Sequence, residues 1–174
     1  MPPDDVSGRH LTPDAADSGE PPTVLLLSGP NLNLLGTRQP EIYGSATLAD
    51  HVRTATDTAE SLGLSVEAVA TNAEAEAVEA IHRARGRNRA IVVNPGAFTH
   101  YSWALHDALA AFEGPVIELH LSNPDAREPW RRTSVVAPVA TGTIAGFGGD
   151  GYRLAIAAVA RLLDLVDRSN HTIK

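Results

Sequence analysis

The sequence predicts an α/β fold in which five parallel strands form one sheet and helices cover both of its faces. The first observation is a length of 174 residues, which suits one domain. The second is a regular alternation, from residue 23 onward, of short apolar runs with longer segments of helical composition. Parallel strands are joined by crossovers, so this alternation indicates right-handed βαβ units. Five strands in about 150 residues favour an open sheet over a barrel, which usually needs about 250 residues.

The predicted strands are short apolar runs bounded by turn residues, as expected for strands that are buried on both faces. The first, Val24–Leu27, ends in the loop sequence Ser28-Gly29-Pro30. The others are predicted at Leu64–Ala70, Ala90–Val93, Pro115–Leu119 and Val135–Ala140. This arrangement predicts a flavodoxin-like sheet, in which ligands bind outside the carboxyl ends of the strands.

The segments between the strands carry helix signals. Thr47 can cap a helix that continues to about Leu62, with Asp50 in its first turn and Gly63 as the stop. Further helices are predicted at Glu74–Arg85, Tyr101–Phe112 and Tyr152–Val166, with a short one at Asp125–Trp130. The histidines on these helices, His51, His82 and His106, are expected to face solvent.

Composition excludes several kinds of chemistry. The chain has no cysteine, which excludes disulfides, thiolate nucleophiles and thiolate metal sites. Its only lysine is Lys174, which argues against an imine-forming lysine and against a Walker A phosphate loop. A net charge of −7 argues against a nucleic-acid partner.

Residues 1–22 differ in composition from the rest of the chain. They hold five prolines and five acidic residues against one arginine, which is typical of a disordered leader, with a binding tail as the alternative. A single domain is expected over residues 23–174. No apolar stretch has the length of a signal peptide core or a membrane span, so we expect a cytoplasmic protein without a membrane partner.

The loop after the first strand, residues 29–44, is long for a connection between a strand and a helix. It carries Arg38 and Tyr43. A guanidinium near a phenol favours the phenolate and lowers the phenol pKa from about 10, which would make Tyr43 a usable base. The alternative is a surface arginine beside a tyrosine that only packs.

Polar side chains also follow the third and fourth predicted strands. Asn94 and His100 follow the third strand, and His120 follows the fourth. A lone histidine at a strand end is more often structural than catalytic, but two at adjacent strand ends favour a functional site. A zinc site made from His100, His120 and a carboxylate is an alternative, although no spacing typical of a zinc motif is present.

The segment after the fourth strand suits an anion. The backbone N–H groups of Leu121 and Ser122, together with the Ser122 hydroxyl, would bind a carboxylate. Arg131 would add a charged, forked donor.

Four segments in order resemble the type II 3-dehydroquinate dehydratases: GPNLNLLGTRQPEIYG at 29–44, NPGAFTHYSWALHDAL at 94–109, ELHLSNPDAREPWR at 118–131 and SVVAPVATGTIAGFGGDGYRLAI at 134–156. The resemblance covers roughly residues 23–167. It implies a flavodoxin-like subunit that assembles as trimers into a homododecamer, with no metal or organic cofactor. The implied substrate is 3-dehydroquinate, dehydrated through an enolate to 3-dehydroshikimate in the shikimate pathway or in quinate catabolism.

The resemblance also implies roles for individual residues. Tyr43 matches the proton acceptor, and Arg38 matches the arginine that favours its phenolate. His120 matches the proton donor to the departing hydroxyl, and Asn31 matches a residue that holds a water near the enolate oxygen. Substrate-binding positions are matched by Asn94, His100, Leu121, Ser122 and Arg131, and a position that reaches a neighbouring subunit's site is matched by Asp107.

The chain departs from the family pattern at three places. His106 stands where an arginine is frequent, Pro129-Trp130 replaces a Glu-Phe pair, and Ala73–Glu76 replaces a His-Glu-Gly-Glu sequence. None of these changes removes a residue with a chemical role.

The alternative from another class is a non-catalytic flavodoxin-like binding or signalling module. A phospho-receiver needs acidic residues at its first strand end and an aspartate after its third strand. Those places hold Ser28 and Asn94, and the first loop does not have the composition of a phosphate-binding loop. The residues therefore favour the enzyme.

Overall fold

The computed structural model describes residues 20–37 and 45–171. Its centre is a five-stranded, wholly parallel sheet with the order β2-β1-β3-β4-β5. The strands are β1 Thr23–Ser28, β2 Ser65–Ala70, β3 Ala90–Asn94, β4 Val116–His120 and β5 Gly142–Ala145. This is the doubly wound, flavodoxin-like order, so the predicted fold class is confirmed.

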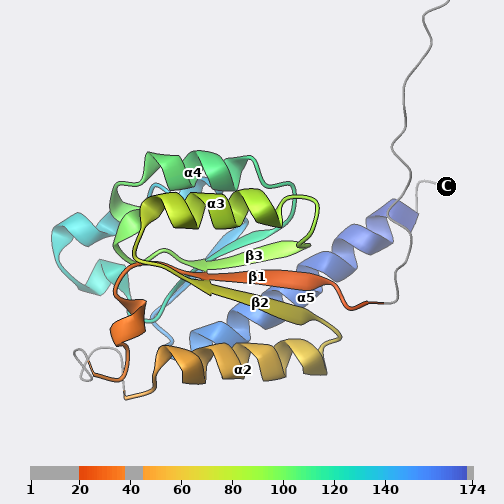
Figure 1. The fold of residues 1–174 in the computed structure, drawn as a ribbon, viewed down its shortest axis with the longest axis horizontal. Coiled ribbons are helices and arrows are strands. Elements are labelled where there is room, and N and C mark those ends of the chain that lie inside the picture. The colour runs from red at the N-terminus through yellow and green to blue at the C-terminus, as the bar shows by residue number, and fades with distance from the viewer. Residues whose placement is uncertain (1–19, 38–44, 172–174) are drawn as a thin grey trace, which may run out of the picture.

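Helices cover both faces of the sheet (Figure 1). One face carries α3 and α4, and the other carries α2 and α5. Their bounds are α2 Leu48–Ser61, α3 Glu74–Ala84, α4 Trp103–Ala110 and α5 Asp150–His171. Each of these four helices overlaps a helix predicted from the sequence, and their ends differ from the predicted ends by a few residues. The short helix predicted at 125–130 is instead two 3₁₀ turns, Pro124–Ala126 and Pro129–Arg132.

The core forms two layers because side chains of a strand alternate between the faces of the sheet. In β1, Val24 and Leu26 belong to the layer under α2 and α5, which also contains Ile156. Leu25 and Leu27 belong to the layer under α3 and α4. The side chains of these four β1 residues are all buried, which explains why this part of the strand is a continuous apolar run rather than an alternating one.

The start of α2 follows directly from the sequence. The Thr47 hydroxyl accepts a hydrogen bond from the Asp50 backbone N–H at 3.2 Å, and the Asp50 carboxylate accepts one from the Thr47 N–H at 2.9 Å. This is a capping box, which satisfies two backbone donors at the helix end.

The fifth strand is not where the sequence predicts it. Residues 135–140 contain a 3₁₀ turn, Ala137–Val139, and β5 follows at Gly142–Ala145. Pro138 has no N–H to give to a strand ladder, and the Val135 N–H donates to the Thr99 carbonyl at 2.7 Å. Val135 and Val136 are apolar because they pack against the α3 and α4 layer, and not because they form a strand.

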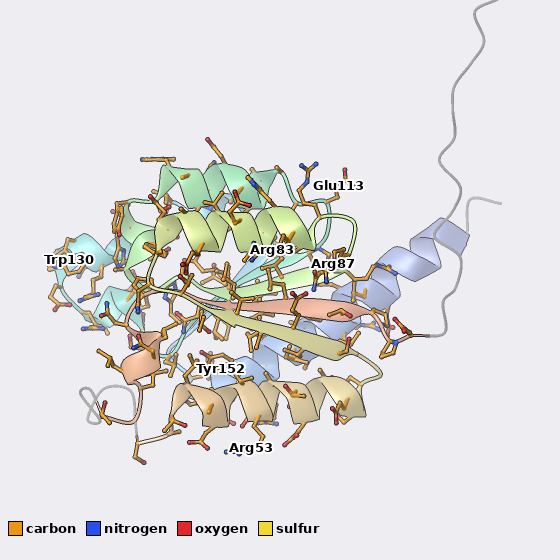
Figure 2. All side chains as sticks on the ribbon, viewed as in Figure 1. Arg53, Arg83, Arg87, Glu113, Trp130 and Tyr152 are labelled. Carbon is orange, nitrogen blue, oxygen red and sulfur yellow. The ribbon has the colours of Figure 1, made fainter. Side chains whose placement is uncertain are left out.

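His51 is buried, contrary to the expectation that it faces solvent. The residue is 4% exposed, and its ring stacks on the Tyr152 ring, with centroids 5.0 Å apart and planes 6° from parallel. Tyr152 lies between the sheet and α2 (Figure 2). A Cβ at Gly149 would lie 2.7 Å from His51 Cε1, so the ring needs a glycine at that position.

We expect His51 to make the fold less stable in mild acid. Burial lowers the pKa of His51, and the Asp50 charge opposes this effect only in part. As pH falls below about 6.5, the unfolded chain therefore binds a proton that the folded chain does not, and the free energy of unfolding decreases. His51→Leu should reduce this loss between pH 7.5 and 5.5 in urea unfolding. His82→Leu, at an exposed histidine, is the control, and an unchanged loss in His51→Leu would contradict the account.

Candidate active site

A cavity opens at the carboxyl ends of β1, β3 and β4, where a doubly wound sheet is expected to bind ligands. Its walls come from the loops that follow these three strands. The sequence-predicted residues that line it are Asn31, Asn94, His100, His120, Leu121, Ser122 and Arg131. The tertiary structure therefore brings together seven residues that span about a hundred positions of the chain.

Two of the sequence-predicted residues, Arg38 and Tyr43, lie outside the described residues. Asp107 is exposed on α4 and does not line the cavity of its own chain.

Close contact between two loops shapes the floor of the cavity. The Gly29 N–H donates to the Asn94 carbonyl at 2.8 Å, and a Cβ at Gly29 would lie 2.4 Å from the Pro95 carbonyl oxygen. A Cβ at Gly96 would lie 2.9 Å from the Pro30 carbonyl oxygen, and Gly96 has a φ of +54°. Both glycines are thus required for the approach of the loops after β1 and β3.

Asn31 adopts the left-handed conformation at the start of the turn after β1, with φ at 66°. Its backbone N–H donates to the Asn72 side-chain oxygen at 2.8 Å, which holds the turn to the loop after β2. Asparagine tolerates this conformation better than most residues.

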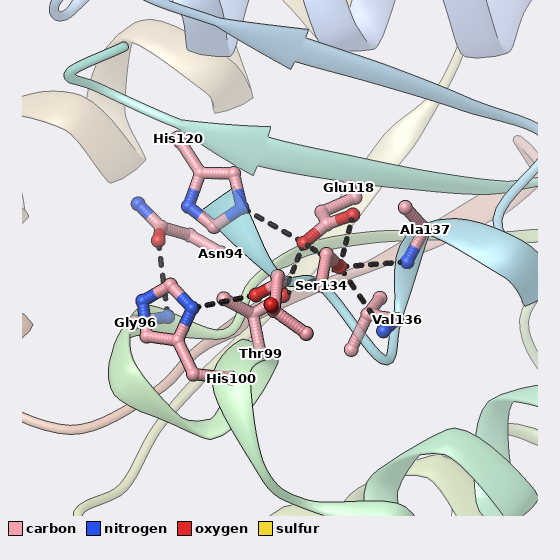
Figure 3. A network of polar contacts seen from close by, with 10 residues as sticks. Asn94, Gly96, Thr99, His100, Glu118, His120, Ser134, Val136 and Ala137 are labelled. Carbon is pink, nitrogen blue, oxygen red and sulfur yellow. Dashed lines mark hydrogen bonds and ion pairs between the residues drawn. The ribbon is translucent and has the colours of Figure 1, made fainter. Parts of the chain in front are cut away.

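His120 contacts a buried carboxylate that the sequence analysis did not identify. His120 Nε2 lies 2.8 Å from Glu118 Oε1, and the Glu118 side chain is fully buried (Figure 3). The two residues share one face of β4 because they are two positions apart. The signal in the sequence was an acidic residue inside an otherwise apolar strand, since a buried charge needs a partner.

Two hydroxyl groups complete the surroundings of Glu118. Thr99 donates a short hydrogen bond to Oε1, and Ser134 Oγ lies 3.0 and 3.1 Å from the two carboxylate oxygens. Burial opposes the negative charge, but hydrogen bonds from His120, Thr99 and Ser134 outweigh it, so the pKa of Glu118 lies below its usual range. Glu118 is therefore a carboxylate at neutral pH.

His100 has one ring nitrogen fixed and one available. Its Nδ1 lies 2.8 Å from the Thr133 carbonyl oxygen, and because a carbonyl only accepts, Nδ1 carries the proton. In the neutral ring, Nε2 then carries no proton and can accept a hydrogen bond. His100 lines the cavity.

Trp130, at one of the departures from the family pattern, organises the rim of the cavity. Its ring meets the His100 ring edge to face at 5.1 Å between centroids, and the Arg131 guanidinium lies 4.0 Å from its centroid. Arg131 Nε also donates to Glu128 at 2.7 Å. Trp130 thus supports both His100 and Arg131.

The Asn94 side chain lies between the cavity and a buried tyrosine. Its amide oxygen accepts a 3.4 Å hydrogen bond from the Gly96 N–H. Burial raises the pKa of Tyr152, and the neighbouring Asn94 side chain opposes this effect. Asn94 lines the cavity and is only 2% exposed.

Within residues 20–37 and 45–171, no group of three or more histidine, cysteine, aspartate or glutamate side chains is arranged to hold a metal ion. In the same part of the chain, no helix has the length and apolar character needed to cross a membrane.

The arrangement combines a histidine held by a buried carboxylate with further polar side chains, Asn94 and His100 among them, around one cavity. Comparisons with known proteins agree on one family. The family model for Dehydroquinase class II matches residues 22–160. The 3-dehydroquinate dehydratase 2 of Pseudomonas putida is 54% identical over 142 residues, which cover 82% of this chain and 95% of that protein. The catabolic 3-dehydroquinase of Aspergillus clavatus is 54% identical over 138 residues, 79% of this chain and 92% of that protein.

A solved structure is similar over the same region. The type II dehydroquinase from Propionibacterium acnes superposes with a TM-score of 0.79 at 42% identity, covering 82% of this chain and 98% of that one.

Proposed function

The chain belongs to the class II dehydroquinase family, and from this membership and the site we infer that it is a 3-dehydroquinate dehydratase. This hydro-lyase removes water from 3-dehydroquinate to give 3-dehydroshikimate. The single observation that carries the proposal is His120 in the cavity, hydrogen-bonded to the buried Glu118 carboxylate. The alternative of a non-catalytic module has no support in the comparisons.

Loss of water from a β-hydroxy ketone needs three kinds of group. A base takes the proton next to the carbonyl, donors stabilise the enolate oxygen that forms, and an acid gives a proton to the leaving hydroxyl. The C–H bond breaks first and its electrons enter the enolate. The C–O bond then breaks as the enolate collapses to the enone, and the departing oxygen leaves as water.

We assign the acid to His120. The Glu118 carboxylate can only accept, so the proton between the two side chains belongs to His120 Nε2. Nδ1 is then the atom that gives its proton to the hydroxyl, and the imidazolium that carries both protons is stabilised by Glu118. This is the same logic by which a carboxylate holds and orients a histidine in other enzymes.

We assign the base to Tyr43, assisted by Arg38. The segment that carries them begins at the cavity, since Leu35 lines it, and its two ends lie close together: a Cβ at Gly36 would lie 3.0 Å from the Ser45 carbonyl oxygen. These positions support a role for the segment in the site. Asn31, which also lines the cavity, is assigned to a water near the enolate oxygen.

Substrate binding is assigned to the remaining residues of the cavity. Leu121 and Ser122 bind the substrate carboxylate, and Arg131 adds a positive charge. The Asn94 amide and the Nε2 of His100 bind the substrate hydroxyl groups. The reaction product is a conjugated enone that absorbs ultraviolet light, so a rise in absorbance on addition of 3-dehydroquinate tests the function. No rise at micromolar enzyme would contradict it.

Sodium borohydride separates this route from one through an imine. Because Lys174 is the only lysine, we expect borohydride and substrate together neither to inactivate the enzyme nor to add mass to it. The control is borohydride without substrate. A substrate adduct on Lys174, found by mass spectrometry, would contradict the enolate mechanism.

We also propose a homo-oligomer of trimers, most simply a dodecamer. Asp107 is exposed on α4 away from its own cavity, as expected for a residue that serves a neighbouring subunit. On the same helix Trp103 is 64% exposed, which is unusual for so large an apolar ring and suits a subunit contact. Light scattering should give a mass near twelve times the 18.3 kDa of the chain. A fully active monomer at assay concentration would contradict the proposal.

A further inference from the structure

The Ser134 hydroxyl is the centre of the polar network around Glu118 (Figure 3). It accepts hydrogen bonds from the backbone N–H groups of Val136 at 3.1 Å and Ala137 at 2.8 Å. It also lies 2.8 Å from the Thr99 hydroxyl and within 3.1 Å of both Glu118 oxygens. The chain from Ser134 into the 3₁₀ turn Ala137–Val139, where the sequence predicts a strand, therefore directs two backbone donors at one side chain.

The protons of this network can be counted. A serine hydroxyl has two lone pairs and one proton. The two backbone N–H groups occupy both lone pairs of Ser134, so its own proton must be donated onward, either to Glu118 or to Thr99. Thr99 for its part donates to Glu118. On either path the chain of donors runs from the backbone of 136 and 137 to the Glu118 carboxylate.

Among the described residues, Glu118 consequently faces donors only. Its Oε1 meets Thr99, Ser134 and His120, and its Oε2 meets Ser134. A protonated Glu118 would have to point its O–H at a group that is itself a donor, which leaves a buried polar group unpaired. His120 is the titratable group that the structure places against Glu118, and the carboxylate obliges it to keep its Nε2 proton.

We propose that Ser134, together with Thr99, is a positioning residue for the dehydration: the two hydroxyls hold Glu118 ionised and in place, so that His120 presents its Nδ1 proton to the leaving hydroxyl. Neither hydroxyl touches the substrate in this proposal, and both act through Glu118. The proposal rests on the proposed function for its catalytic part. The ionisation of Glu118 is a property of the free enzyme and can be measured without substrate.

Two pairs of variants test the proposal. Thr99→Val keeps the shape of the side chain and removes the hydroxyl, whereas Thr99→Ser keeps the hydroxyl. Ser134→Ala removes the second hydroxyl, and Ser134→Thr retains it. Removing a hydrogen bond to a charged group should lower kcat by about 10-fold or more, while the hydroxyl-retaining partners stay within about threefold of the wild type. KM should change little, because neither residue lines the cavity.

The pH dependence separates positioning from a merely structural role. With one donor removed, Glu118 takes up a proton at higher pH, so the acid limb of the kcat profile should move upward by roughly one pH unit. In infrared difference spectra of the substrate-free enzyme, the carboxyl band of Glu118 should titrate with the same upward shift. The band is assigned to Glu118 by its absence from Glu118→Gln.

Three outcomes decide the matter. A loss of kcat with matched shifts of the acid limb and the carboxyl band in Thr99→Val and Ser134→Ala supports the proposal. A loss of kcat with both pH readouts unchanged overturns it, as does an unchanged kcat. If Ser134→Ala does not fold, the Thr99 pair still decides. If the wild type does not dehydrate 3-dehydroquinate, the proposed function fails, while the infrared titration still reports on how Ser134 and Thr99 act on Glu118.

Discussion

Tyr43→Phe should lower kcat by at least about 100-fold, the low end expected when a general base is removed. A phenol at its reference pKa of about 10 is ionised in only about one molecule in a thousand at pH 7. Such scarcity would cost roughly 4 kcal/mol of catalytic advantage, at about 1.4 kcal/mol for each pKa unit. The loss in Tyr43→Phe is expected because a phenyl ring has no proton acceptor at all.

Arg38→Ala should lower kcat by a similar factor. The guanidinium favours the phenolate, so its removal leaves a smaller fraction of Tyr43 ionised and able to act as the base. The double variant should lose far less than the product of the two single effects, since the residues act as one unit. Steady-state kinetics on the four proteins measure this directly.

Binding separates a catalytic effect from damage to the cavity. A product analogue with a carboxylate should bind Tyr43→Phe nearly as well as the wild type, because we assign that contact to Leu121 and Ser122. Tyr101→Phe is the matched control, since Tyr101 is exposed and does not line the cavity. A near-normal kcat in Tyr43→Phe would assign the base to another residue, with His100 the next to test.

His120→Gln should lower kcat by about 100- to 10,000-fold. The glutamine amide can occupy the place of Nε2 and donate to Glu118, so the buried carboxylate keeps a partner and the fold is preserved. What disappears is the proton on Nδ1 that the leaving hydroxyl needs.

His106→Asn is the control for the histidine substitution. His106 Nδ1 lies 2.6 Å from the Val135 carbonyl oxygen, and an asparagine amide can replace that donor. His106 does not line the cavity, so kcat should remain within about threefold of the wild type. If His120→Gln were as active as His106→Asn, the acid would have to be another group.

The partial failure of the strand predictions has a definite cause. The run at 135–140 is apolar enough to suggest a strand, but its valines pack under α4 and its proline interrupts any ladder. The real β5, Gly142–Ala145, is short and only half-buried, so it carries a weak apolar signal. Hydrophobicity records that a residue is buried without recording which partner buries it.

The same distinction applies to the site. The residues at the carboxyl ends of β1, β3 and β4 could be predicted to meet, because parallel strands deliver their ends to one edge of a sheet. Glu118 could not be assigned a role, since its partners Thr99 and Ser134 lie 19 and 16 positions away in sequence. The burial of His51 differs from the prediction for a related reason: it depends on Tyr152 and Gly149, about a hundred residues further along the chain.

The sequence by itself determined the alternation of strands and helices, the capping box of α2, the exclusion of an imine-forming lysine and the types of polar residue that follow β1, β3 and β4. These features depend on local pattern or on residue type, which the sequence contains in full. Only the tertiary structure decided the position of β5, the burial of His51 and the set of donors that surrounds Glu118. Each of these depends on contacts between distant segments, where the partner of a buried group, rather than its own chemistry, determines its charge and its orientation.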